Sequence, residues 1–212
     1  MTASTDWQAY YGRPFCASGL SRRYTRRVLL GMMERFIDRS GGAALRVAEL
    51  GGGGSCFLQS VLALLPLEEY HVFDTSAAGL ERVRQEARQG AVRLHQADVL
   101  DGAAAFAGTF DLVFSVGLVE HFDAPGTAKA IDTHFEMLRA GGLAIISYPT
   151  PTWSYRLIRG AAEAAGVWRF PDERPLRGQE VLPVVARHGQ VLGRKLLWPI
   201  LLTQEMIAAR KR

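Results

Sequence analysis

Short apolar runs alternate with amphipathic stretches along most of this chain. The runs are bounded by glycines or polar turns, and in the stretches between them apolar residues recur every three to four positions. Such runs predict buried strands, and the three-to-four spacing predicts helices. The predicted strands are 45–50, 70–73, 91–95, 110–115, 143–148, 190–197 and 201–209, and the predicted helices are 21–38, 55–65, 77–89, 127–139 and 178–188.

Strands that alternate with helices are typical of crossover connections. The pattern therefore predicts an α/β fold, a doubly wound and mostly parallel sheet with helices on both faces. Ligands of such sheets bind outside the carboxyl ends of the strands, near the point where the strand order reverses. The residues that directly follow each predicted strand are therefore the first place to look for chemistry.

The length of 212 residues suits one domain around one hydrophobic core. We expect residues 1–42 to form an N-terminal helical extension that acts as a lid. Residues 43–150 would form the ligand-binding core. Residues 151–212 would supply an insert on the substrate side and the last two strands.

Composition narrows the class of protein. Apolar residues make up 48% of the chain and charged residues 22%, as in a soluble globular domain. The start of the chain lacks the layout of a secretory signal and no apolar run is long enough to span a bilayer, so we expect a cytoplasmic protein. Two cysteines make no disulfide framework, and no spacing of ligand residues indicates a metal site.

The net charge of +4 comes with a local cluster of arginines on the first predicted helix. A charge this small does not predict nucleic-acid binding. The cluster could contact the phosphate of a carrier or an acidic membrane, or it could be a solvated helix face. Its members are Arg22, Arg23, Arg26 and Arg27.

A glycine loop, 51–54, follows the first strand and precedes a predicted helix. Glycine allows positive φ angles and a close approach of the backbone to a ligand. Dinucleotide-binding proteins use a similar loop, so the loop alone identifies no ligand. Glu49 stands just before it, where a carboxylate suits a cationic amino-acid group and would repel a pyrophosphate.

Acidic residues follow the next two strands. Asp74 lies at the distance from the loop where a carboxylate accepts hydrogen bonds from ribose hydroxyls. Its alternative role is that of a turn or helix-capping residue, together with Thr75. Asp98 could accept from an adenine amine while Val99 packs against the ring, or it could be an ordinary turn carboxylate.

These segments together resemble the class I S-adenosylmethionine-dependent methyltransferases, over residues 43–150. The matching stretches are VAELGGGGS, VFD, QADV, FDLVFSVGLVEHF and LRAGGLAIISYPTP. The resemblance implies seven strands in the order 3-2-1-4-5-7-6, with strand 7 antiparallel, and S-adenosylmethionine as cofactor. It implies these cofactor-binding residues: Glu49, Gly51, Gly52, Gly53, Ser55, Asp74, Thr75, Asp98, Val99, Ser115, Val116 and Gly117.

One position departs from the pattern of that family. Ser55 stands where a third glycine is usual. A serine is tolerated at the start of a helix. It could narrow the pocket or donate a hydrogen bond to the carboxylate of the cofactor.

Methyl transfer to a hydroxyl needs alignment and a base. His121 is the first candidate because its ordinary pKa lies near neutrality, and Glu120 is the second. Both follow the fourth predicted strand. The alternative is that His121 packs over the cofactor or caps a helix.

The acceptor would lie between the N-terminal segment and the insert after the fifth strand. The candidate substrate-binding residues are Tyr11, Arg13, Tyr148, Trp153 and Tyr155, of which the aromatic ones could equally be packing residues. The N-terminal YxGRP stretch, the GGGGSCF loop and the PDERPL segment also resemble methyltransferases of bacterial surface-polysaccharide biosynthesis, less specifically than the class I resemblance. They imply a sugar hydroxyl, on a nucleotide or a lipid-phosphate carrier, as acceptor.

Several alternatives stay open at this stage. A quinone-type phenol is the competing acceptor. A catalytically silent cofactor-binding protein and a nicotinamide oxidoreductase are the competing classes. The acceptor atom and the oligomeric state do not follow from the sequence.

Overall fold

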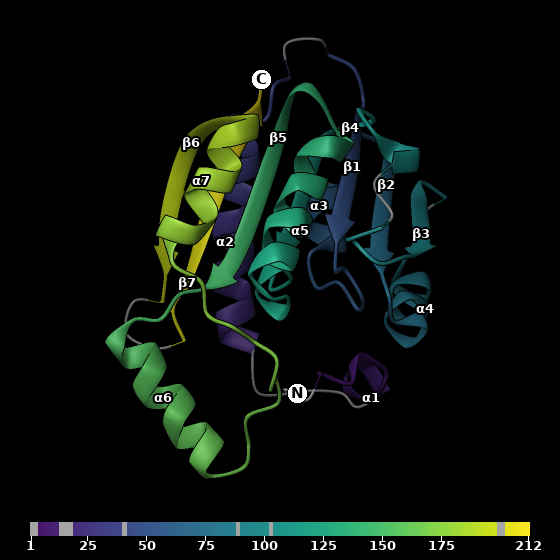
Figure 1. Ribbon diagram of the computed structural model, residues 1–212. Coiled ribbons are helices and arrows are strands. Elements are labelled where there is room, and N and C mark those ends of the chain that lie inside the picture. Colours follow the sequence, from purple (N-terminus) through teal and green to yellow (C-terminus); the bar gives the residue numbers. More distant parts are fainter. Residues whose placement is uncertain (1–3, 13–18, 40–41, 88–89, 102–103, 199–201) are drawn as a thin grey trace.

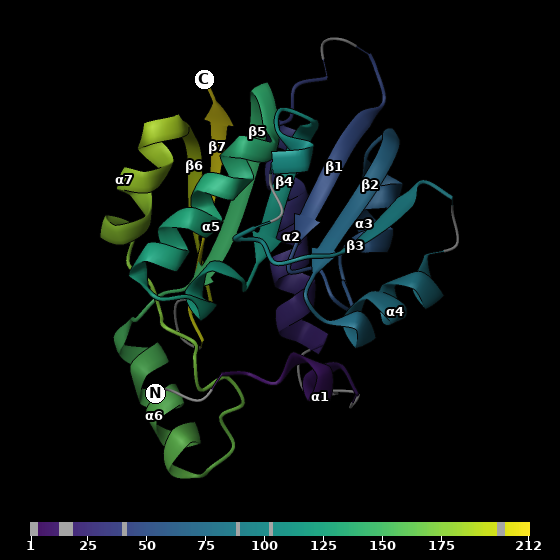
Figure 2. The same cartoon turned by 45° about the vertical axis from the view of Figure 1, so that its right-hand side comes forward.

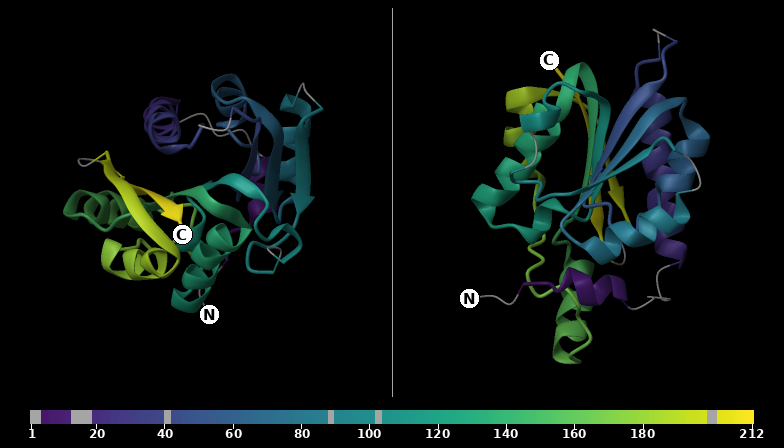
Figure 3. Two further views of the ribbon diagram at one scale, coloured as in Figure 1. Left: turned by 90° about the horizontal axis from the view of Figure 1, so that it is seen from above. Right: turned by 90° about the vertical axis from the view of Figure 1, so that its right-hand side faces the viewer.

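The computed structural model describes residues 4–12, 19–39, 42–87, 90–101, 104–198 and 202–212. Seven strands form one sheet with helices on both faces (Figures 1 and 3). The strands are β1 Leu45–Leu50, β2 Leu67–Asp74, β3 Val92–Gln96, β4 Phe110–Val116, β5 Leu138–Pro149, β6 Gly189–Leu197 and β7 Gln204–Lys211.

The strand order is β3-β2-β1-β4-β5-β7-β6, and β7 runs antiparallel to both of its neighbours. This confirms the predicted fold class, strand order and antiparallel strand. The order reverses between β1 and β4, which pair in parallel through Val47↔Leu112 to Leu50↔Ser115. The carboxyl ends of these two strands therefore lie side by side at the switch point, where such sheets bind ligands.

Alternating side chains of the central strands feed two separate cores. In β5, Leu143 and Ile145 pack with the helices α2 (Gly19–Phe36), α3 (Leu58–Leu64) and α4 (Ala77–Glu86). Ala144 and Ile146 instead pack with α5 (Ala124–Met137) and α7 (Gly178–His188) on the other face. Burial on both faces explains why these strands read as continuous apolar runs.

The predicted elements have the right type, and several boundaries move. Helix α5 begins three residues before the prediction because Asp123 caps it, its side chain accepting a hydrogen bond from the Gly126 amide at 2.8 Å. Strand β5 begins at Leu138, five residues early, and β7 at Gln204, three residues late.

Two short helices lie at the carboxyl edge of the sheet. They are α1 (Trp7–Gly12), for which the apolar pattern gave no signal, and α6 (Trp153–Ala164), in the insert after β5. Figure 2 shows α1 crossing beneath the strand ends and α6 projecting away from the body of the molecule. The N-terminal segment and the insert thus meet where the fold places its ligands. No helix in the described part of the chain has the length and apolarity to cross a membrane.

Candidate active site

The glycine loop after β1 is shaped by positions that exclude a side chain. Gly51 and Gly54 have φ angles of +67° and +58°, which favour glycine. At Gly52 an added Cβ would lie 2.7 Å from Cγ1 of Val72 and 2.8 Å from Cγ of Glu49. The loop therefore lies directly on the ends of β1 and β2.

Asp74 holds this loop in place. Its Oδ2 accepts a hydrogen bond from the Gly53 amide at 2.7 Å, and its Oδ1 accepts one from the Ser76 amide at 2.7 Å. Burial raises the pKa of this carboxyl group, against the lowering effect of the two amides. Each oxygen keeps a further lone pair, so the geometry is compatible with accepting a ligand hydroxyl. Asp74 is thus both a turn residue and a candidate ligand-binding residue.

Glu49 lies beneath the loop and is only 4% exposed. Its Oε1 accepts a hydrogen bond from the Ser55 hydroxyl at 2.8 Å, and its Oε2 accepts one from the Tyr70 hydroxyl at 2.5 Å. Burial raises the pKa of Glu49 to about 7, although both hydroxyl groups oppose the shift. In this arrangement the carboxyl group supports the loop, and its contact with a ligand stays a prediction.

Ser55 is a structural residue of the loop. Its hydroxyl donates to Glu49 and accepts from the amides of Phe57 and Leu58, at 3.1 and 3.2 Å. The serine therefore satisfies the free amides at the start of α3. The Ser55 hydroxyl donates its hydrogen bond to Glu49. It therefore cannot also donate one to the carboxylate of a cofactor, as the sequence had allowed.

Tyr11 of α1 covers the loop from outside. An added Cβ at Gly53 or Gly79 would lie 2.8 or 2.9 Å from its ring, and at Gly54 3.3 Å. Three glycines therefore form a slot that the ring fills. Burial raises the pKa of the Tyr11 hydroxyl, and the negative charge of Asp74 adds to the effect. The N-terminal segment therefore contacts the glycine loop, and its role as a lid stays a prediction.

The other predicted cofactor residues lie along the same edge of the sheet. Asp98 is exposed, and its Oδ1 accepts from the Leu100 amide at 2.9 Å, the contact of a turn residue. The Ser115 hydroxyl is buried against Nε2 of His134 at 2.9 Å, so this serine can offer only its backbone to a ligand. The remaining members of the set are Thr75, Val99, Val116 and Gly117.

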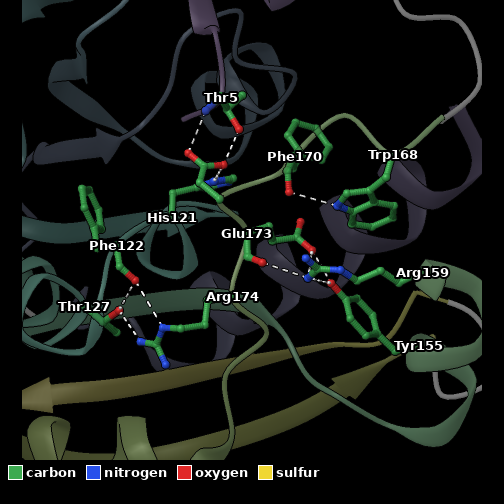
Figure 4. Close-up of polar contacts among 11 residues, drawn as sticks. Thr5, His121, Phe122, Thr127, Tyr155, Arg159, Trp168, Phe170, Glu173 and Arg174 are labelled. Carbon is green, nitrogen blue, oxygen red and sulfur yellow. Dashed lines mark hydrogen bonds and ion pairs between the residues drawn. The ribbon is translucent and has the colours of Figure 1, made fainter. Parts of the chain in front are cut away.

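His121 lies in a 3-10 turn after β4 and is held by Asp172. Nδ1 of His121 and Oδ1 of Asp172 are 3.1 Å apart. Asp172 also accepts from the Thr5 amide at 2.9 Å and from the Thr5 hydroxyl (Figure 4). A carboxylate can only accept from Nδ1–H, which leaves the lone pair of the neutral imidazole on Nε2.

The surroundings of His121 keep its ring neutral. Burial lowers the pKa of His121, more strongly than the hydrogen bond from its ring to Asp172 raises it. Burial alone would raise the pKa of Asp172, yet the bonds from Thr5 and His121 hold it below its usual value. The ring of Trp7 packs edge-on against His121 with centroids 4.9 Å apart, and Phe170 lies 6.0 Å away. His121 can therefore accept a proton at neutral pH.

Glu120, the second predicted base, is 2% exposed. Its Oε2 has no hydrogen-bond partner among the described residues. Burial raises the pKa of Glu120 well above its usual value, and the charges of Glu173 and Asp172 raise it further. This shift favours the protonated form, which cannot accept a proton, so the surroundings favour His121 over Glu120 as the base.

A cavity of about 830 Å³ opens beside His121. Tyr155 of α6 forms part of its wall, and its hydroxyl donates to Oε1 of Glu173. Arg159 donates to the Glu173 carbonyl at 2.8 Å and lies over the ring of Trp168 at 5.2 Å (Figure 4). These bonds fix α6 to the segment that carries Asp172.

The other predicted acceptor residues lie elsewhere. Tyr148 is fully buried, with its hydroxyl donating to Oε2 of Glu205 at 2.9 Å, and Trp153 is 75% exposed and does not line the cavity. Arg13 lies outside the described residues. The arginine cluster sits on α2, where three of its members line a separate groove of about 460 Å³. They are Arg23, Arg26 and Arg27.

Sequence reasoning did not single out Asp172 or Thr5. The PDER segment and its acidic pair were visible, and a histidine that acts as a base calls for an orienting carboxylate. Nothing in a single sequence, however, indicates which of 21 acidic residues packs against His121.

Residues 47–142 match the model of a methyltransferase domain. This part of the chain therefore resembles a methyltransferase domain. It contains the glycine loop, Asp74 and the turn with His121, and it leaves α1, α6 and Asp172 outside. No curated protein matches the chain significantly.

Solved structures share the fold over nearly the whole chain. The N-methyltransferase NodS from Bradyrhizobium japonicum WM9, with S-adenosyl-L-homocysteine, is 16% identical with a TM-score of 0.64, covering 87% of this chain and 86% of its own. Magnesium protoporphyrin IX methyltransferase (ChlM) from Synechocystis PCC 6803, with the same compound, is 10% identical with a TM-score of 0.72, covering 96% and 92%.

A third similar structure has a less specific description. It is a possible exported protein from Bordetella parapertussis, 15% identical with a TM-score of 0.72, covering 99% of this chain and 80% of its own. At these identities the likeness establishes the fold. Together with the domain match it confirms the class I methyltransferase resemblance for the core. The antiparallel β7 and the match to a methyltransferase domain argue against the oxidoreductase alternative.

Proposed function

We propose that this protein is an S-adenosylmethionine-dependent O-methyltransferase that acts on a hydroxyl group of a small molecule or glycan. The observation that carries the proposal is the pairing of His121 with Asp172 beside the cavity. That pairing occupies Nδ1–H and leaves the lone pair of the neutral imidazole on Nε2. A hydroxyl acceptor needs such a base, because its proton must leave as the oxygen attacks.

The loop side of the site fits this cofactor. S-adenosylmethionine supplies an electrophilic methyl group on a sulfonium ion. Asp74 beside the glycine loop offers acceptor lone pairs for ribose hydroxyls, as the predicted role requires. Gly53 leaves no room for a side chain between Asp74 and Tyr11, so a larger residue there would displace Asp74 or Tyr11. Glu49 supports the loop from below.

The other side of the site would position and deprotonate the acceptor. His121 Nε2 takes the proton of the hydroxyl as the oxygen bonds to the methyl carbon and the carbon–sulfur electron pair passes to sulfur. Asp172 keeps Nδ1 protonated and stabilises the imidazolium that forms. Trp7 and Phe170 shield the ring from water. Alignment at near-attack distance supplies the rest of the acceleration.

Two acceptor types are compatible with this arrangement. A sugar on a nucleotide or lipid-phosphate carrier follows from the softer sequence resemblance. A quinone-type phenol is the competing type. Trp7, Tyr10 and Phe170 lie within 6.0 Å of one another or of His121, next to the cavity but not among the residues that line it. Flat rings bind readily between aromatic side chains.

The test is to compare methylated products in extracts treated with the purified protein, S-adenosylmethionine and either soluble glycans or phenols. Titration with S-adenosylhomocysteine establishes cofactor binding separately. Product formation that disappears in His121→Ala, with cofactor binding retained, would support the proposal. Tight cofactor binding without turnover on any acceptor class would support the catalytically silent alternative.

A further inference from the structure

Helix α6 presents its apolar face to solvent. Of the five large apolar side chains that are most exposed among the described residues, three belong to α6 and the loop directly after it. Trp153 is 75% exposed, Leu157 66% and Val167 65%. A surface helix of a globular protein normally turns its apolar stripe inward.

The exposed stripe is continuous along the helix. Trp153 and Leu157 are four residues apart and therefore lie on one face. The next positions on that face are Gly160, Ala161 and Ala164, all exposed and uncharged. The opposite face carries the polar contacts that bind α6 to the protein, through Tyr155 and Arg159.

The base of α6 is held firmly, so the stripe projects in a defined direction. The Thr152 side chain caps the helix by accepting from the Tyr155 amide at 3.2 Å, and its hydroxyl lies 2.7 Å from that of Thr203. Leu202, 42% exposed, precedes Thr203 in the chain. Figure 1 shows α6 beyond the carboxyl edge of the sheet, clear of both helix layers.

The charge around the stripe is basic. Arg156, Arg169 and Arg177 are exposed on α6 and on the segment that follows it. The exposed acidic residue of the helix, Glu163, is paired with Arg159 at 2.7 Å. An aromatic and aliphatic stripe, on a segment whose exposed charges are mostly arginines, complements a layer of acidic headgroups over hydrocarbon.

We propose that α6 docks this protein on an acidic membrane surface, with Trp153 and Leu157 inserted at the headgroup boundary. The face that carries the His121 cavity then lies toward the bilayer, because α6 forms one wall of that cavity. A second copy of the chain fits the surface less well, since a symmetric contact would bring the same arginines together. The proposal concerns binding to lipid and does not depend on the identity of the acceptor.

The test is cosedimentation of the full chain with vesicles of phosphatidylcholine, with and without phosphatidylglycerol. We expect binding to the mixed vesicles that weakens as salt is added. Trp153→Ser combined with Leu157→Ser should lower the bound fraction by at least about 10-fold, because each side chain loses its burial in the bilayer. The matched control is Leu196→Ser, which alters an exposed apolar residue of β6.

Fluorescence gives a second readout. Trp153 is the one exposed tryptophan of the four, so insertion should shift the emission of the wild-type protein to the blue. In Trp153→Phe binding should persist while the shift is lost. Absence of binding by the wild-type chain, or binding unchanged by the double substitution, would overturn the proposal.

A change of oligomeric mass in the double variant, measured by sedimentation equilibrium, would assign the surface to a second copy and likewise overturn it. Titration with S-adenosylhomocysteine should be unaffected in every variant. This separates the docking proposal from the methyltransferase proposal, which fails only if cofactor binding or turnover fails.

Discussion

The glycine-loop side of the site and the His121 side are built from contacts of very different reach. The hydrogen bonds that hold Gly53 and Glu49 span 21 positions of the chain or fewer. Those of Asp172 span 51 positions to His121 and 167 to Thr5. The first set forms once two adjacent strands pair, whereas the second requires the N-terminal segment and the insert to dock on the finished sheet.

The two sides of the site therefore depend on different parts of the fold. The loop side rests on buried strands and lies within the matched domain. The His121 side depends on segments at the edge of the sheet, which are the parts of a fold that open most easily. Changes on one side should therefore leave the other measurable.

The largest expected effect comes from His121→Ala. Loss of a general base lowers turnover by about 10²–10⁴-fold. Affinity for S-adenosylhomocysteine should stay within about 2-fold, since no contact of the glycine loop is altered. Turnover is measured with whichever acceptor class, glycans or phenols, yields a methylated product with the wild-type protein. Unchanged turnover would leave His121 as a packing residue.

Gly53→Ala tests the opposite side. The added Cβ would lie 2.6 Å from Oδ2 of Asp74 and 2.8 Å from the Tyr11 ring, so the loop must shift. We expect cofactor affinity to fall by roughly 10-fold or more, corresponding to about 1.4 kcal/mol. Calorimetric titration with S-adenosylhomocysteine measures it.

Gly31→Ala is the matched control. Its Cβ meets nothing within 4 Å, and it lies inside α2, where alanine favours the helix by about 0.5–1 kcal/mol. The thermal midpoint should therefore rise while cofactor affinity stays unchanged. Equal loss of affinity in both variants would show that the loop is not specifically sensitive.

The pH dependence of kcat/KM tests the roles of His121 and Asp172. Burial lowers the pKa of His121 below 6.5, so kcat/KM should rise through a pKa under about 6.5 and stay level above it. Asp172→Asn removes a charge that raises this pKa, which should move the rise to lower pH and reduce the plateau less than His121→Ala does. A profile that does not move would exclude Asp172 as a positioning residue.

The smallest effect concerns stability. Burial raises the pKa of Glu120 well above 4.5, so the folded state binds its proton more tightly than the unfolded state. Stability from this proton is complete at acid pH and is lost as the pH rises. Glu120→Gln should therefore raise Tm at pH 8, where the carboxyl group of the unfolded chain is ionised.

The gain in Glu120→Gln should vanish near pH 4, where the wild-type carboxyl is protonated in both states. Calorimetric scans of the wild-type protein and Glu120→Gln at pH 4 and pH 8 measure this gain in Tm. A gain that is equal at the two pH values would show that the substitution acts through packing and not through ionisation.

The period of the apolar residues determined the strands and the helices that cover the sheet, whereas the strand order followed from the resemblance to the class I methyltransferases. This succeeded because the central strands are buried on both faces and the helices that cover them on one. The loop side was also readable, because Glu49, the glycines and Asp74 are brought together by one pair of neighbouring strands. Even so, the sequence did not indicate that the hydroxyl groups of Ser55 and Tyr70 would donate hydrogen bonds to the Glu49 carboxyl group.

Only the tertiary structure decided the partners on the other side. Asp172 is one acidic residue among 21, and its role arises from docking of segments that share no local pattern with His121. The same holds for Trp153, predicted to contact the acceptor and found exposed, and for Tyr148, found buried. A sequence fixes which side chains alternate along an element, whereas the direction of a docked helix depends on long-range packing.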